Sequence, residues 1–226
     1  MTTACVVGST GLVGANILSS LLDSSVFSKV HAYTRRDLQS NAKLDAIRSS
    51  DTSTWAASYP KDADIFYSGL GTTRALAGGF ENQRKIDFDF NLELAKAAKA
   101  AGTKVYVLIS SASSNSKSVF GYVKMKGELE EEVIKLDFEH TIIVRPGLLI
   151  GQRTDSRAAE SVFRNIAKAM NSINGYLQDF WAQEVQVVGR AAVAASLRVL
   201  AGNETRKVWY VEQSEIIKLG RTQWKS

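Results

Sequence analysis

The 226-residue sequence has one cysteine, two histidines and two prolines. The lone Cys5 excludes an intramolecular disulfide, favours a reducing compartment and is expected to be buried because it lies in an apolar run. His31 and His140 are far apart, and no cysteine or carboxylate near them has the spacing typical of a metal site. We therefore predict no metal.

Long apolar runs and dense basic blocks are also missing. No stretch approaches the roughly 20 apolar residues that span a bilayer, and the first predicted strand begins almost at Met1, which leaves no room for a presequence. The net charge of +5 is dispersed, so a nucleic-acid partner is not expected. The 45% hydrophobic and 23% charged residues are typical of a globular protein, so we expect a sizeable core.

Apolar strands alternate with amphipathic helices along the chain. This pattern predicts an α/β fold: a single-domain Rossmann fold with a doubly wound, mostly parallel sheet and helices on both faces. Residues 1–226 would form one NAD(P)-binding domain, with ligands outside the carboxyl ends of the strands. The expected strands are 4–8, 29–36, 46–49, 63–71, 104–111, 140–147 and 207–212, and the expected helices are 15–25, 89–102, about 119–135 and 190–201.

The pattern is less regular after Gly151. We expect 151–226 to complete the sheet and to contribute the substrate-side segment. Residues 157–181 have an apolar face, which suits a core-facing helix or, as the alternative, a membrane-surface helix.

A glycine-rich loop follows the first predicted strand and opens the first helix. Its sequence, GSTGLVG, predicts dinucleotide binding, because glycines allow a tight turn and a close approach of backbone to a pyrophosphate. The free N–H groups at the start of the helix favour the negative charge. The predicted contacts are Gly8, Ser9, Thr10, Gly11, Leu12, Val13 and Gly14.

Two arginines stand where the second strand ends. An NAD site usually has an acidic residue there, whereas Arg35, with Arg36 as partner or alternative, suits the 2′-phosphate of NADP(H). The competing interpretation is two surface arginines paired with Asp37. Asp51, after the third strand, could accept a hydrogen bond from the adenine or cap a turn.

The stretch GYVKMKG places Tyr122 and Lys126 four residues apart, on one face of a predicted helix. An adjacent ammonium favours phenolate, so we expect Lys126 to lower the pKa of Tyr122 and to prepare it for proton transfer. The alternative is a half-buried tyrosine beside a solvated lysine.

Five stretches together resemble one family far more specifically than any of them alone. They are GSTGLVG, SGLGTTRALAGG, LISSAS, GYVKMKGELEE and IVRPGLLIGQR, within about residues 3–153. The chain resembles the atypical short-chain dehydrogenases/reductases, in the branch of the Tat-interacting-protein-type oxidoreductases, and most of all their fungal relatives of the mitochondrial outer membrane.

This resemblance implies a catalytic set of Ser111, Tyr122 and Lys126, with Ser110 and Ser113 as neighbours that could be confused with Ser111. Tyr122 and Lys126 would also contact the cofactor. Two further loops would line it, namely Gly69, Leu70, Gly71 and Thr72 after the fourth strand, and Arg145, Pro146 and Gly147 after the sixth. Many members of the family use an asparagine in a proton relay to the lysine, and Asp87 and Asn91 are the two candidates for that role here.

The expected function is an NADPH-dependent oxidoreductase that reduces a small or lipid-like carbonyl by hydride transfer. The alternative is an NADPH-binding regulator or scaffold with little or no catalysis. The expected partner is a small carbonyl or alcohol substrate, and peripheral membrane association and a homodimer are left open. By resemblance, the location would be the mitochondrial outer membrane or the cytoplasm.

Overall fold

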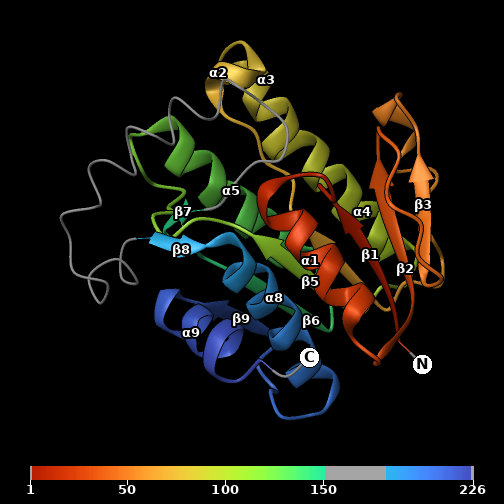
Figure 1. Cartoon of the computed structure of the whole chain (residues 1–226). Helices are drawn as coiled ribbons and strands as arrows, with labels where there is room; N and C mark the ends of the chain where they lie inside the picture. The colour runs from red at the N-terminus through yellow and green to blue at the C-terminus, as the bar shows by residue number, and fades with distance from the viewer. Residues whose placement is uncertain (1, 151–181, 225–226) are drawn as a thin grey trace.

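The computed structural model describes residues 2–150 and 182–224, and their main feature is a seven-stranded parallel sheet (Figure 1). The strand order is β3-β2-β1-β4-β5-β6-β9. The order reverses between β1 and β4, which is the switch point where doubly wound sheets bind ligands. The strands are β1 (Thr2–Val7), β2 (Phe27–Thr34), β3 (Leu44–Arg48), β4 (Ile65–Ser68), β5 (Val105–Ile109), β6 (His140–Val144) and β9 (Val208–Val211).

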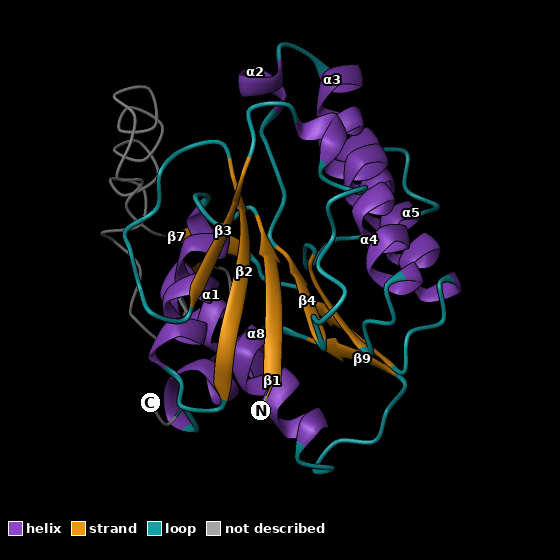
Figure 2. Cartoon of the chain, turned by 90° about the vertical axis from the view of Figure 1, so that its right-hand side faces the viewer, coloured by secondary structure: helices purple, strands orange, loops and turns teal. Residues whose placement is uncertain are grey.

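Helices cover both faces of the sheet (Figure 2). One face carries α1 (Leu12–Asp23) and α8 (Val185–Leu200), and the other carries α4 (Asn91–Ala100) and α5 (Gly121–Lys135). The predicted fold class is thereby confirmed. The shorter elements are the helices α2 (Arg74–Ala77), α3 (Phe80–Arg84) and α9 (Gln213–Ile217), the 3₁₀ turn η1 (Thr52–Thr54), the π-helical turns η2 (Lys85–Phe90) and η3 (Lys218–Thr222), and a parallel pair, β7 (Leu148–Ile150) with β8 (Ala182–Glu184).

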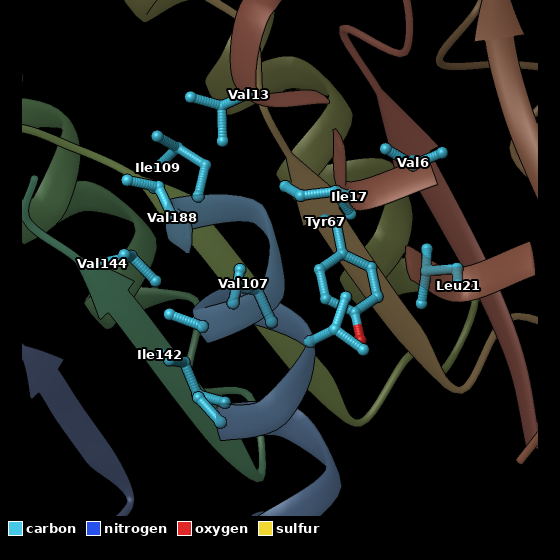
Figure 3. Close-up of a cluster of buried hydrophobic side chains, with 14 of the residues drawn as sticks. Val6, Val13, Ile17, Leu21, Tyr67, Val107, Ile109, Ile142, Val144 and Val188 are labelled. Carbon is cyan, nitrogen blue, oxygen red and sulfur yellow. The ribbon is translucent and has the colours of Figure 1, made fainter. Parts of the chain in front are cut away.

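Two hydrophobic cores result from the alternation of side chains along the strands. In β1, Ala4 and Val6 belong to the core under α1 and α8, whereas Cys5 and Val7 belong to the core under α4 and α5. Figure 3 shows the first core, where the buried Tyr67 hydroxyl forms a hydrogen bond with Ser196 Oγ at 2.5 Å. Cys5 is a free, buried thiol, as expected.

The chain after β6 differs most from expectation. The predicted helix 190–201 begins five residues earlier, at Val185, and β7 and β8 were not predicted. β9 pairs with β6 at the edge of the sheet. The predicted amphipathic segment 157–181 lies outside the described residues, and the single-domain organisation of 1–226 stays a prediction.

Candidate active site

The glycine loop between β1 and α1 packs backbone against backbone. Gly8 has φ +78°, and its carbonyl accepts a hydrogen bond from Gly11 N at 2.8 Å. A Cβ on Gly14 would lie 2.1 Å from Gly8 O, and one on Gly8 would lie 2.5 Å from Gly69 O. No side chain caps α1 at Gly11, so the first N–H groups of the helix are left for an anion.

The other predicted residues of this loop have different environments. Ser9 is buried, and its Oγ donates to Tyr33 O at 2.7 Å, which ties the loop to the end of β2. Val13 lies in the core, so its backbone alone could face a ligand. Thr10 is exposed and Leu12 is half-buried.

The arginines at the end of β2 stand on a turn that Thr34 fixes. Thr34 Oγ1 accepts from Arg36 N at 3.0 Å and donates to Arg36 O at 2.7 Å. Arg35 is exposed. Asp37 pairs with Arg48, Oδ1 to Nη1 at 2.6 Å, and the β2–β3 register places Arg48 opposite Thr34. Sequence reasoning missed Arg48, although its place at the end of a strand beside β2 was a usable signal.

Asp51 caps the turn η1. Its Oδ1 accepts from Ser53 N at 3.0 Å and from Ser53 Oγ at 2.6 Å, and these hydrogen bonds hold the pKa of its carboxyl below the usual value. The structure thus gives Asp51 the turn-capping role that was one of its two interpretations. Its contact with adenine stays a prediction.

The loop after β4 lies beside the glycine loop. Gly69 N donates to Val7 O at 3.0 Å, and a Cβ on Gly69 would lie 3.1 Å from the Cα of Gly14. Leu70 packs on the core under α4 and α5, and Thr72 N donates to Asp87 Oδ1 at 2.8 Å. The loop is therefore anchored at both ends, and Gly71 is exposed between them.

Ser111 is separated from its neighbours by what each contacts. Ser110 is buried, and its Oγ donates to Glu130 and lies 2.9 Å from Ser114 Oγ. Ser113 is exposed. The Ser111 hydroxyl is the one of the three that lowers the pKa of the Tyr122 phenol. The structure therefore brings Ser111, rather than Ser110 or Ser113, together with the predicted catalytic tyrosine.

Lys126 is 3% exposed, and its Nζ donates to Ile109 O at 3.1 Å. Burial lowers the pKa of Lys126, and the carboxylates of Asp87 and Glu130 oppose that shift. The alternative of a solvated lysine beside Tyr122 is therefore wrong. The Lys126 ammonium has three N–H donors, and within the described residues one of them is used, by Ile109 O. The other donors can bind hydroxyl groups of a ligand.

Tyr122 is 43% exposed and does not have the pKa shift that we expected. Its pKa is raised, first by burial and then by Asp87, while the hydrogen bond with Ser111 lowers it. The expectation that Lys126 lowers the pKa of Tyr122 is not met, because the phenol is partly removed from water and the negative charge of Asp87 disfavours the phenolate.

Asp87 belongs to the site, and Asn91 supports the core. Asp87 is 2% exposed in the π-helical turn η2, and its charge acts on both Tyr122 and Lys126. Asn91 Oδ1 accepts from Ser68 Oγ at 2.7 Å and from the Tyr106 hydroxyl at 3.2 Å. Of the two relay candidates, Asp87 is the one whose charge reaches the tyrosine and the lysine.

Replacing Asp87 by asparagine is expected to stabilise the protein at pH 7. Burial raises the pKa of the Asp87 carboxyl in the folded protein above its unfolded value of about 3.9. The stability that the protonated carboxyl contributes is therefore fully present below that unfolded pKa, and it is lost as the pH rises through the folded pKa. An asparagine keeps the acceptor for Thr72 N and avoids the buried charge. The gain would be about 1.4 kcal/mol for each unit of the pKa shift.

Thermal unfolding at a series of pH values measures this effect. The melting temperature of Asp87→Asn should exceed that of the wild type at pH 7, and the gap should narrow towards pH 4. The exposed Asp89→Asn in the same turn is the control and should leave the gap near zero. A variant less stable than the wild type at pH 7 would contradict the assigned cost of the buried charge.

The side chain of Arg145 is bound by two carboxylates and one aromatic ring. Its Nε and Nη2 donate to Glu130 at 3.1 and 2.5 Å, and its Nη1 donates to Glu212 at 3.2 Å. Its guanidinium also lies over the ring of Tyr210 at 4.3 Å. The predicted cofactor contact of Arg145 stays a prediction.

The loop of Pro146 and Gly147 is held beside the loop that carries Ser111. Pro146 O accepts from Ala112 N at 2.9 Å, and Gly147 N donates to Gln183 Oε1 at 2.7 Å. Glu130, which joins Ser110 to Arg145, was missed from the sequence. Its place one helical turn after Lys126 was the only signal.

Two further classes of feature are not found in the described parts of the chain. No group of three or more His, Cys, Asp and Glu side chains within 2–150 and 182–224 could hold a metal ion. Each helix in those ranges is too short or too polar to cross a bilayer.

Comparison with known proteins places the chain in a family. A model of the HIM1 family matches residues 24–178. The chain belongs to the HIM1 family. A relative from Emericella nidulans, "Protein fmp52, mitochondrial", is 50% identical over 232 residues, which covers 98% of this chain and 100% of the relative. The protein of the same name from Aspergillus niger is 44% identical, covering 99% and 100%.

Solved structures with this fold include enzymes that act on nucleotide sugars. The UDP-glucose 4-epimerase of Thermotoga maritima aligns with a TM-score of 0.67 at 14% identity, covering 100% of this HIM1-family chain and 84% of the epimerase. MoeE5, solved with UDP-glucose and NAD, aligns with a TM-score of 0.66 at 16% identity, covering 98% and 81%. At such identities the likeness shows the fold alone.

The predicted family is confirmed. The HIM1-family match, the fungal relatives named mitochondrial and the Rossmann fold agree with an atypical short-chain dehydrogenase/reductase.

Proposed function

We propose that the protein is an NADPH-dependent reductase of small or lipid-like carbonyl compounds. The observation that supports this most is the buried Lys126, which lies on the same helix as Tyr122 and is bonded to the end of the strand that leads to Ser111. Burying a lysine is expensive, so such a position favours a functional role over a solvated surface.

The described residues fit a dinucleotide. A Cβ would fill the cradle at Gly8 and Gly14, the start of α1 is uncapped, and Lys126 retains donors for ribose hydroxyls. The backbone of the loops after β4 and β6 would line the remainder of the cofactor. Several solved structures with this fold are complexes with NAD, which supports a nicotinamide cofactor.

Each side chain has a distinct role in the proposed reaction. The nicotinamide supplies a hydride to the carbonyl carbon when it is bound. Tyr122 donates a proton to the carbonyl oxygen as negative charge builds there, and Ser111 donates a hydrogen bond to the same oxygen. Lys126 orients the ribose, and its charge favours the phenolate that remains. The charge of Asp87 opposes the lowering of the Lys126 pKa that burial causes.

Arg35 supports NADPH over NADH. Arg35→Ala is expected to weaken NADPH binding about 10- to 100-fold, the value of a charge-assisted hydrogen bond to phosphate, and to leave NADH binding unchanged. Calorimetric titration with both cofactors measures this preference. Arg198→Ala, at the end of α8, is the matched control. Equal affinity for NADH and NADPH in the wild type would overturn the assignment to NADP.

A cofactor-binding regulator remains the second candidate function. The raised pKa of Tyr122 favours it, because a phenol that resists ionisation is a poor base for the reverse oxidation. NADPH binding without turnover across a carbonyl panel would support the regulator. The proposed location is peripheral, on the outer membrane of mitochondria, and the mitochondrial names of the relatives support the organelle.

A further inference from the structure

The loop before α5 exposes two apolar side chains in succession. Val119 is 92% exposed and Phe120 is 71% exposed, the two highest values among the large apolar side chains of residues 2–150 and 182–224. A Cβ on Gly121 would lie 3.0 Å from Phe80 Cζ, so this tip lies against the start of α3. Leu76 on α2, the helix before α3, is 59% exposed. No other side chain within the described ranges covers these three apolar side chains.

The surroundings of the tip carry more positive than negative charge. Lys117 and Lys124 flank it in the sequence, and both are exposed. Glu128 is neutralised by Arg84 at 2.7 Å and lies 3.8 Å from Lys124. Across α2, α3 and residues 115–128, the side chains that reach solvent include four cations and two carboxylates, namely Arg74, Arg84, Lys117 and Lys124 against Glu81 and Glu128.

We propose that the Val119–Phe120 tip, with Leu76 beside it, inserts into the surface of a membrane that contains anionic lipid. An aliphatic and an aromatic side chain flanked by lysines suit the boundary between headgroups and acyl chains, where the apolar groups are buried and the cations meet lipid phosphates. A stable protein interface would need about 20–30 residues on each side, which is far more than this tip offers.

The tip lies next to the proposed catalytic tyrosine. It is separated from Tyr122 by Gly121 alone, and α2 follows the loop after β4, so both elements project from the carboxyl ends of the strands. Docking would turn Tyr122 towards the bilayer, from which an apolar carbonyl could enter. This orientation rests on the proposed function, whereas the docking itself does not.

A single labelled cysteine tests the contact directly. Because the native Cys5 is fully buried, Val119→Cys can be labelled selectively with an environment-sensitive fluorophore. The matched control is Val26→Cys, which is 44% exposed just before β2, at the amino ends of the parallel strands and therefore at the other end of the sheet. Both proteins are mixed with vesicles of phosphatidylcholine, with and without phosphatidylglycerol, in the absence of cofactor and substrate.

We expect the label at 119 to shift to the blue and brighten severalfold with the anionic vesicles, and the label at 26 to stay unchanged. The double variant Val119→Ser/Phe120→Ser should sediment with these vesicles at least about tenfold less than the wild type, at an unchanged melting temperature. Wild-type protein that fails to sediment, a double variant that sediments equally, or a response at residue 26 as large as at 119 would overturn the proposal.

The vesicle assay needs neither NADPH nor turnover. A negative vesicle result therefore overturns the docking and does not bear on the reductase proposal. Absence of turnover, in turn, does not bear on the docking. Binding of the tip to another protein without any vesicle binding would also overturn the assignment of lipid.

Discussion

Replacing Tyr122 by phenylalanine is expected to lower kcat/KM for carbonyl reduction by about 10²- to 10⁴-fold, the usual contribution of a positioned general acid. The ring, its packing and the rest of the site remain, so NADPH should bind as tightly as to the wild type. The loss should therefore be in kcat, because the proton is needed only as charge builds on the carbonyl oxygen. Steady-state kinetics with a panel of carbonyl substrates, beside calorimetric titration with NADPH, separates the two effects.

Tyr210→Phe is the matched control for this variant. Tyr210 is a tyrosine of similar exposure, 37%, on β9, and Arg145 lies over its ring, which phenylalanine retains. Its loss of a hydroxyl should leave kcat within about twofold of the wild type, as a surface change does. If Tyr122→Phe turned over substrate as fast as Tyr210→Phe, Tyr122 would not be the proton donor, and the regulator would be the better interpretation.

Gly14→Ala is expected to have the largest effect on the fold and on cofactor binding together. The new Cβ would lie 2.1 Å from Gly8 O, which is backbone and can move only if the loop moves. Overpacking of this kind costs about 1–3 kcal/mol of the free energy of unfolding. For a protein of this size that corresponds to a fall of several degrees in the melting temperature. The displaced loop should also lose most of the thermal stabilisation by NADPH.

The matched control for crowding is Gly71→Ala in the neighbouring loop. A Cβ there would meet its nearest atom, Asp87 Oδ2, at 4.0 Å, an ordinary contact. Its melting temperature without cofactor should equal that of the wild type. Two variants with the same melting temperature would contradict the close packing of the loops at Gly8, Gly14 and Gly69.

Local patterns were enough to predict the parallel sheet and the glycine loop that joins its first strand to the first helix. The run ACVVG, the glycines after it and the helix that follows each specify their own conformation, so β1, the loop and α1 could be placed from neighbouring residues alone. The same holds for Tyr122 and Lys126, because a helix fixes which residues share a face.

Properties that depend on distant segments could not be predicted. The pKa of Tyr122 is raised first by burial and then by the charge of Asp87, 35 residues away, and no spacing rule connects a π-helical turn with the start of α5. The ion pairs of Arg145 with Glu130 on α5 and with Glu212 before α9 were not predicted either. Both features arise from packing between elements, which residue spacing does not record.

The π-helical turn η2 also makes the active site sensitive to the length of the chain. Each π-helical turn holds about one residue more than an α-helical turn, so deleting Phe88 or Asp89 would let the turn become α-helical without breaking α4. Residues before the deletion would then rotate by about 100° relative to those after it. Asp87 could be carried away from Thr72 while Asn91 stayed in the core. A family member shorter by that single residue would keep this fold and lose the carboxylate beside its tyrosine.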